Sequence, residues 1–315
     1  MKNLIIKIKF FLYNLLSDFM KEIISYLYNI NVDNCDKVKN HTIYKNENSS
    51  YLYEEVDDAN RVYFINRYIS YLNQFTFFSY RFVPNIYNEI ISKYHDKNFV
   101  LIDVGTDYMN QVDFEEMLNF YSISNRLIIN KIKYKNNWDV LWESKINYLY
   151  QHFNNHQISN KNIFYLFNYY ISISENVLKY IIKIKNENYN NVNDISFVHR
   201  RIFYPNIKLN FFNPLNFIVD LKVRDIGEYI KSMYYNNKDY INDLSYFLKT
   251  NHLDRYTASM MYARIIYPSI FFDDYELNRV DISKYIKIAE YEKFTKKIYD
   301  LISSYIQIDK IDWLN

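Results

Sequence analysis

The sequence predicts an α+β protein in which a small β-rich lobe precedes a larger, mostly helical lobe. Two observations lead to this prediction. Before Gly105, short apolar runs alternate with turn residues, as in "VKNHTIYKNENSSYLYEEV" and "ISKYHDKNFVLIDVG". After Gly105, apolar residues recur at helical spacing, as in "NIFYLFNYYISISENVLKYIIKIKN". A chain of 315 residues is long enough for one large core or two modest lobes.

Residues 1–30 predict an amphipathic helix. Apolar residues recur at helical spacing, namely Ile5, Ile8, Leu12, Leu15, Phe19, Ile23 and Leu27. Lys7 and Lys9 interrupt the run and no small-residue cleavage site follows, so a secretory signal is not predicted. No uncharged stretch reaches the ~20 residues that span a bilayer. We expect the helix to dock on the protein's own core or on a partner; the alternative is peripheral contact with a membrane surface.

Residues 31–105 predict the β-rich lobe. Two strands should flank the turn "KNENSS", and a second strand pair should flank "KYHDKN". Between them, Asp57 or Asp58 can cap a helix. The apolar residues of that helix share one face, and they are Val62, Ile65, Ile69 and Leu72.

Residues 106–315 predict the helical lobe. Its long helix should bury one stripe, made of Ile163, Phe167, Tyr170, Val177, Ile181 and Ile184. The loop "ISFVHRRIFYPNIKL" follows. We then expect a hairpin of "IKLNFF" and "NFIVDLKV", turned by Asn213 and Pro214, and mostly helices to the end.

Composition excludes several function classes. The 38 Lys+Arg nearly balance the 36 Asp+Glu, so no field of one sign indicates nucleic acid. The single cysteine, Cys35, excludes an intramolecular disulfide and fits synthesis in a reducing cytoplasm. With Gly105 and Gly227 as the only glycines, no glycine-rich phosphate loop can form. The 36 Tyr and 23 Phe fit an AT-biased genome, and they also offer interface anchors.

One loop has the spacing of a phosphotransferase catalytic loop. Such loops carry a His, an Asp two residues later and an Asn five further on, just before a strand. This chain has His199, Arg201 and Asn206, followed by Ile207. Phosphoryl transfer needs a carboxylate at the attacking hydroxyl, ligands for magnesium and a cation on the phosphates.

These residues resemble the aminoglycoside-phosphotransferase branch of the kinase-like fold, in which the loop reads H-x-D-x-x-x-x-N-I. "NFIVDL" looks like the strand that delivers the second metal-binding Asp, which the resemblance places at Asp220. More narrowly, about residues 22–275 resemble the CotS-type spore coat proteins. The order and spacing of several segments carry this resemblance: "IISYLYNINV", "YLYEEVDDANRVYFINRYISYLNQF", "HRRIFYPNI", "VRDIGEYIKSMY" and "YARIIYPSIFF".

The resemblance implies a bilobal protein-kinase-like fold and an association with the coat of bacterial endospores. It implies cytoplasmic synthesis followed by placement in the spore coat, where other coat or assembly proteins are the partners. Nucleic acid is not an expected partner.

Two departures from the family pattern argue against catalysis. The nucleotide-binding lysine of the fold falls at Glu54, and the catalytic carboxylate has become Arg201. Two unit charges about 4 Å apart interact by on the order of 4 kcal/mol at an effective dielectric near 20, so both changes oppose binding of Mg²⁺ and triphosphate. Loss of the general base alone costs roughly 10²–10⁴ in rate. We therefore expect no catalytic residue, no cofactor and no working metal site.

Asn206 and Asp220 remain as vestigial metal-ligand candidates, although the short gap from Asp220 to Asp225 leaves Asn213 as an alternative metal-Asp position. His199 is expected to brace the loop, and Asp225 to cap the following helix. Arg201 either pairs with Asp220 across the former metal site or is solvated.

The sequence thus favours a catalytically inactive kinase-like protein that is a structural or assembly component of the spore coat. One alternative is an ATP-dependent small-molecule phosphotransferase with Glu228 or Asp225 as a rearranged base. A second alternative is a non-catalytic binder of an anionic ligand, held by Arg201.

Overall fold

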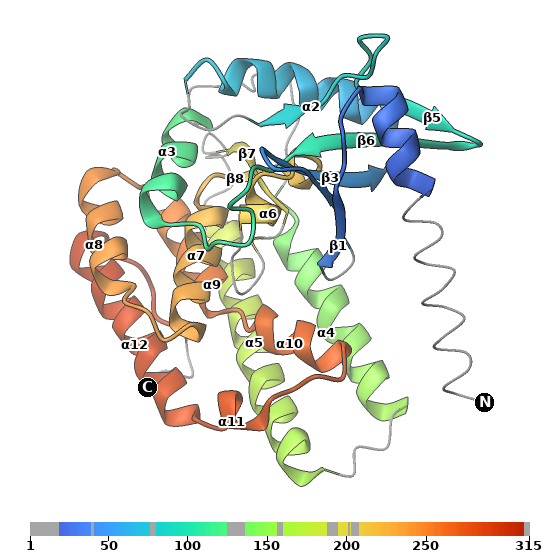
Figure 1. Ribbon diagram of the computed structural model, residues 1–315. Coiled ribbons are helices and arrows are strands. Elements are labelled where there is room, and N and C mark those ends of the chain that lie inside the picture. Colours follow the sequence, from blue (N-terminus) through green and yellow to red (C-terminus); the bar gives the residue numbers. More distant parts are fainter. Residues whose placement is uncertain are drawn as a thin grey trace. The chain divides into compact units, whose positions relative to one another are not determined.

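A computed structural model describes residues 19–38, 41–75, 80–124, 136–155, 160–187, 195–200, 202 and 208–311 (Figure 1). The chain divides into two compact units. The first comprises residues up to Val112 together with Ile207–Phe217, and the second comprises Asp113–Asn206 and Ile218–Asn315. The first unit therefore takes in a short segment from late in the sequence.

The first unit contains an antiparallel sheet. Its strands are β1 (Asn34–Val38), β2 (His41–Lys45), β3 (Ser50–Glu55), β4 (Arg81–Phe82), β5 (Ser92–Tyr94) and β6 (Lys97–Asp103). They follow the order β1-β2-β3-β6-β4, and β5 also pairs with β6. Both predicted strand pairs are confirmed: β2 pairs with β3, and β5 pairs with β6. In the first turn the side chain of Asn46 accepts hydrogen bonds from the amides of Asn48 and Ser49, which fixes the register.

Two helices of the first unit bury apolar faces. The predicted stripe of α2 (Ala59–Leu72) is buried, and Asp58 caps the helix by accepting from the Arg61 amide. Residues 19–28 are helical. Ile24 and Tyr28 pack there in a cluster with Tyr44, Phe99 and Leu101 of the sheet, while Ile23 and Leu27 are only partly buried. The remainder of the predicted N-terminal helix, residues 1–18, lies outside the described residues.

The second unit is mainly helical. It contains α3 (Phe114–Ser124), α4 (Trp138–Asn155), α5 (Lys161–Glu187), α7 (Val223–Tyr235), α8 (Ile241–Thr250), α9 (Arg255–Ile266), α10 (Ser269–Glu276), α11 (Ile282–Tyr285) and α12 (Ile288–Tyr305). The α5 stripe is confirmed, except that Ile163 is half-buried.

Helix α7 is the centre of this unit, because every residue in it except Tyr234 is buried. It packs against α9 at Gly227, where a Cβ atom would lie 3.2 Å from Cγ of Arg264. The glycine therefore allows the two helices to approach closely.

The predicted hairpin of "IKLNFF" with "NFIVDLKV" is wrong. Lys208–Phe211 forms α6, Pro214–Asn216 forms the 3₁₀ helix η1, and β8 (Phe217–Leu221) pairs instead with β7 (Ile195–His199). The amides of Lys208 and Leu209 donate to the carbonyls of Asn110 and Tyr108, so they are not available to a strand partner. Asn213 accepts from the Leu215 amide and starts η1 with Pro214 at its first position.

No helix within the described ranges is both long enough and apolar enough to cross a membrane.

Candidate functional site

The predicted site residues fall in different parts of the structure. His199 ends β7 and Asp220 lies near the end of β8, both in the helical unit, whereas Glu54 lies in β3 of the β-rich unit. Asn213, the alternative metal-Asp position, caps η1 in the β-rich unit. Arg201 and Asn206 lie outside the described residues, and so does the predicted pair between Arg201 and Asp220.

His199 is fixed by Asp225. Its backbone amide lies 3.1 Å from both carboxylate oxygens, and its ring Nδ1 lies 2.7 Å from Oδ2. Both side chains are almost completely buried, and the Phe120 ring packs 4.6 Å from the imidazole. The prediction that Asp225 caps the next helix is wrong. Lys222 is the N-cap residue of α7, and Asp225 lies in the first turn with its carboxylate turned toward His199.

Asp220 accepts hydrogen bonds from a tryptophan and from its own strand. The indole Nε1–H of Trp138 lies 3.0 and 2.9 Å from the two carboxylate oxygens, and the Leu221 amide lies 2.7 Å from Oδ1. Asp220 is 5% exposed and Trp138 is 1% exposed. An ionised carboxylate buried to this degree needs a counter-charge as well as hydrogen bonds.

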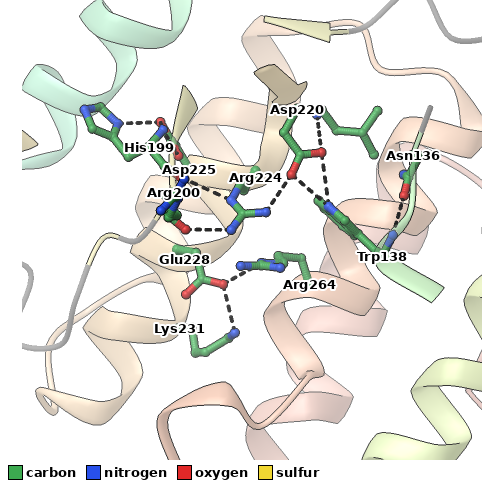
Figure 2. Close-up of polar contacts among 11 residues, drawn as sticks. Asn136, Trp138, His199, Arg200, Asp220, Arg224, Asp225, Glu228, Lys231 and Arg264 are labelled. Atoms are coloured by element: carbon green, nitrogen blue, oxygen red, sulfur yellow. Dashed lines mark hydrogen bonds and ion pairs between the residues drawn. The ribbon is translucent and has the colours of Figure 1, made fainter. Parts of the chain in front are cut away.

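Arg224 supplies that counter-charge (Figure 2). Its Nη1 lies 2.6 Å from Oδ2 of Asp220, which is four residues earlier in the sequence. The same guanidinium donates from Nε to the carbonyl of His199 and from Nη2 to the carbonyl of Arg200. Arg224 therefore joins Asp220, where the family resemblance places a metal aspartate, to the residues at the end of β7. Burial and the charge of Arg264 lower the pKa of its guanidinium.

A second buried group of charges lies further along α7. Nε of Arg264 lies 2.5 Å from Oε1 of Glu228, and Nζ of Lys231 lies 3.2 Å from the same oxygen and 2.9 Å from the Ser269 hydroxyl. Burial alone would raise the pKa of Glu228, but the charges of Lys231, Arg264 and Arg224 outweigh it and bring this pKa down to about 2. Burial lowers the pKa of Lys231 to about 8, even though Glu228 opposes that change.

Aromatic rings connect the two charge groups. The Arg264 guanidinium lies 5.1 Å from the Trp138 ring and 5.8 Å from the Trp142 ring, and Trp142 stacks on Tyr267 at 4.1 Å. Asn136 fixes the start of α4 because its side chain accepts from the Trp138 amide. The Trp138 indole that binds Asp220 is thus in contact with the Arg264 guanidinium, and Asn136 binds the backbone amide of the same residue.

Sequence reasoning missed Arg224 and Trp138. The signal for Arg224 was present, because an Asp and an Arg four residues apart can pair when the first ends a strand and the second starts a helix. Trp138 is 82 residues from Asp220 in the sequence, and no local pattern connects them.

In the β-rich unit, the carboxylate of Glu54 contacts a histidine ring. Nδ1 of His41 in β2 lies 2.6 Å from Oε1 of Glu54, and the amide of Asn213 lies 3.5 Å from the same oxygen. Both side chains are about one-quarter exposed. The β3 position where the family resemblance expects a cation therefore carries an anion with a neighbouring imidazole.

These residues do not fit a magnesium–nucleotide site. A divalent cation about 4 Å from the Arg224 guanidinium would be repelled by about 8 kcal/mol at an effective dielectric near 20. The oxygens of Asp220 already accept from Trp138, Leu221 and Arg224. Within the described part of the chain, no group of three or more His, Cys, Asp or Glu side chains could hold a metal ion.

The fold is that of the aminoglycoside-phosphotransferase class of kinase-like proteins. An aminoglycoside phosphotransferase from Alicyclobacillus acidocaldarius matches with a TM-score of 0.54 and 11% identity, over 88% of this chain and 92% of that one. Spectinomycin phosphotransferase APH(9)-Ia, solved with ADP and spectinomycin, matches with a TM-score of 0.56 and 10% identity, over 91% and 98%. The amicoumacin kinase hAmiN matches with a TM-score of 0.54 and 12% identity, over 90% and 93%.

The family is more specific than the fold. Residues 21–309 match the family described as "Spore coat putative kinase YutH", and the chain belongs to this family. The CotS-type resemblance and the kinase-like fold predicted from the sequence are both confirmed. No curated protein matches the sequence.

Proposed function

We propose that this protein is a kinase-shaped component of the bacterial spore coat that transfers no phosphoryl group. The single observation that carries the loss of catalysis is the buried Arg224–Asp220 pair, with Trp138 as a further donor to the carboxylate. A guanidinium stands beside the carboxylate that the family resemblance assigns to a metal ion.

Binding of a metal ion would be opposed at several steps. The ion would have to displace the guanidinium, and Arg224 would then be left buried without its counter-charge. The same movement would break the contacts of Arg224 with the carbonyls of His199 and Arg200. In addition, Arg201 stands at the position that the family resemblance assigns to the catalytic base, and Glu54 stands at the position that it assigns to the nucleotide-binding lysine.

A rearranged catalytic base is poorly supported by the two candidates in the sequence. The Asp225 carboxylate is bound to the amide and the ring of His199. Glu228 is 9% exposed and paired with Arg264 and Lys231. A general base must reach the proton of a substrate hydroxyl, and both carboxylates face protein donors instead.

The coat role rests on membership of the spore coat family. A protein without catalysis would act through its surfaces, as a structural or assembly component that contacts other coat proteins. We propose that it is made in the cytoplasm and then incorporated into the coat.

Isothermal titration calorimetry with Mg-ATP tests the loss of catalysis. We expect no binding by the wild-type protein at about millimolar nucleotide, where even a weak site has a free energy of about −4 kcal/mol. Asp220→Asn is the matched variant, and its titration should look the same as that of the wild type. Micromolar binding by the wild type that Asp220→Asn abolishes would show that Asp220 still serves a metal–nucleotide complex.

Fractionation of purified spores tests the coat role separately. We expect an epitope-tagged chain to be extracted with the coat proteins and to be absent from the core fraction. A protein found only in the cytosol of vegetative cells would contradict the coat assignment, whatever the calorimetry shows.

A further inference from the structure

One short segment of the β-rich unit comes from late in the sequence. It runs from Lys208 to Phe217 and contains α6 and η1, and we call it the α6–η1 strap. The chain on either side of it belongs to the helical unit. In the strap, Leu209, Phe211 and Phe217 have 1%, 0% and 2% of their surface exposed. The apolar side chains of the strap are therefore buried, and the contacts that fix it can be followed from one end to the other.

The start of the strap is attached to the loop that follows β6. The amides of Lys208 and Leu209 each lie 2.8 Å from a backbone carbonyl oxygen, those of Asn110 and Tyr108 respectively. Nζ of Lys208 also lies 2.7 Å from Oδ2 of Asp107. Two backbone hydrogen bonds and an ion pair thus fix the first turn of α6.

Tyr80 attaches the strap to the end of α2. Its buried ring packs against three phenylalanine rings of the strap. The distances between ring centroids are 6.2, 5.7 and 5.2 Å, to Phe211, Phe212 and Phe217 respectively. The side chain of Asn73, the C-cap residue of α2, binds the carbonyl and the amide of Tyr80 at 2.7 and 3.1 Å. The ring on which the strap packs is therefore fixed by the helix end.

Arg61 attaches the end of the strap to the start of α2. Its Nη2 lies 2.7 Å from the carbonyl oxygen of Leu215 and 3.4 Å from that of Phe217. The Phe217 ring also packs 5.7 Å from the ring of Tyr68 on the same helix. Hydrogen bonds from a charged donor are stronger than those between neutral groups. We therefore expect Arg61 to contribute strongly to the attachment of η1.

The middle of the strap reaches β3 at Glu54. Nδ2 of Asn213 lies 3.5 Å from Oε1 of Glu54, and Asn213 is 8% exposed. The family resemblance assigns the nucleotide-binding lysine to the position of Glu54. A phosphate or a base between two protein groups needs roughly 6–7 Å, because it must keep about 3–3.5 Å from each of them. The contact between Asn213 and Glu54 leaves no such space between these two side chains.

We propose that the α6–η1 strap is an intramolecular cover of β3 at Glu54, so that a nucleotide could bind at this position only by displacing the strap. Displacement would break the backbone bonds of Lys208 and Leu209, the packing on Tyr80 and the bonds from Arg61. This role of the strap rests on the assignment of Glu54 in the proposed function, but not on the charges in the helical unit. Nucleotide binding is then opposed by a steric cause in the β-rich unit as well.

Hydrogen exchange measured by mass spectrometry tests the attachment of the strap. We expect the amides of residues 208–217 to be protected in the wild type. Arg61→Met should speed their exchange by roughly 10–100-fold, the factor that corresponds to loss of a hydrogen bond from a charged donor. The amides of β6 should exchange as in the wild type, because the opening is local. Arg67→Met is the matched control, since Arg67 is an exposed arginine of the same helix, and it should leave the strap protected.

Several results of this experiment would contradict the cover. Strap amides that exchange in the wild type as fast as those of an unstructured peptide would show that the strap is not attached. Equal rates in Arg61→Met and Arg67→Met would show that Arg61 does not hold it. Equal acceleration of the strap and of β6 in Arg61→Met would show that the β-rich unit opens as a whole, without a separate cover.

Calorimetry with ATP in the absence of Mg²⁺ tests the cover itself, because Asp220 then has no metal ion to bind. Glu54→Lys restores the cation of the family pattern, and Glu54→Gln is the matched control that keeps an acceptor for Asn213. We expect neither variant to bind ATP at about millimolar concentration, since the strap still occupies the surface.

Hydrogen exchange in the presence of ATP decides the meaning of any binding by Glu54→Lys. Binding accompanied by faster exchange of the strap amides would support displacement of the strap. Binding with the strap amides still protected would overturn the proposal, because the nucleotide would then fit beside the strap. That result would leave the proposed function standing, because the Arg224–Asp220 pair is not involved.

Discussion

The family resemblance places a nucleotide lysine at Glu54, in the β-rich unit, and a metal aspartate at Asp220, in the helical unit. The two carboxylates have different partners. Glu54 is about one-quarter exposed and meets a similarly exposed imidazole. The Asp220 side chain is 7% exposed and meets a guanidinium and an indole. The charge of a side chain near solvent can change sign with little compensation, because water screens it. A retained carboxylate in the interior needs a new cation, and α7 provides one.

This comparison predicts the largest effect at Arg224. Arg224→Met should lower the free energy of unfolding by about 3–5 kcal/mol, because Asp220 would remain buried without its cation. Urea denaturation followed by circular dichroism measures the change.

The double variant Arg224→Met with Asp220→Leu distinguishes the contribution of the ion pair from that of the other contacts of Arg224. Removing both charges should recover much of the lost stability, since a buried ion pair can often be replaced by apolar residues of similar size. A double variant as unstable as Arg224→Met alone would mean that the contacts of Arg224 with the loop carbonyls, not its pairing with Asp220, account for the effect.

The next largest effect is expected at Trp138. Trp138→Phe keeps an aromatic ring beside Trp142 and Arg264 but removes the N–H donor to Asp220, which should cost about 1–3 kcal/mol. Trp142→Phe is the matched control, because its indole stacks on Tyr267. Equal losses of stability in the two variants would assign the effect to packing and not to the Asp220 hydrogen bonds.

The comparison also shows what the sequence could predict. The α2 stripe, the Asp58 cap and the two hairpins follow from local periodicity and turn chemistry, and the structure has them. The partners of Asp220 and Asp225 do not follow, because Trp138 and His199 are distant in sequence and meet these carboxylates only when the helical unit packs. The "IKLNFF" strand failed for a related reason: its first amides bond to residues 108–110 across the fold.

A smaller, pH-dependent effect is expected at Lys231. Its pKa is about 8 in the folded protein against 10.5 ordinarily, so between these values the unfolded chain holds a proton that the folded chain has released. Stability due to this residue therefore rises with pH across that window and is lower below it, where the buried amine is charged.

Lys231→Met lacks this titration. The difference in unfolding free energy between wild type and variant should shift in favour of the wild type as the pH is raised from 8 toward 10.5. Tyrosines titrate in the same range but are common to both proteins. A difference that stays constant across the window would show that the amine keeps its ordinary pKa when buried.

The smallest effect is expected at His41. Replacing it with Ala removes the partner of Glu54, and a pair this exposed contributes about 0.2–1 kcal/mol. The loss should be far smaller than that caused by Arg224→Met, which leaves a buried carboxylate without its cation. Urea denaturation of both variants measures the contrast. If His41→Ala proved as costly as Arg224→Met, Glu54 would have to depend on its partner as strongly as Asp220 does.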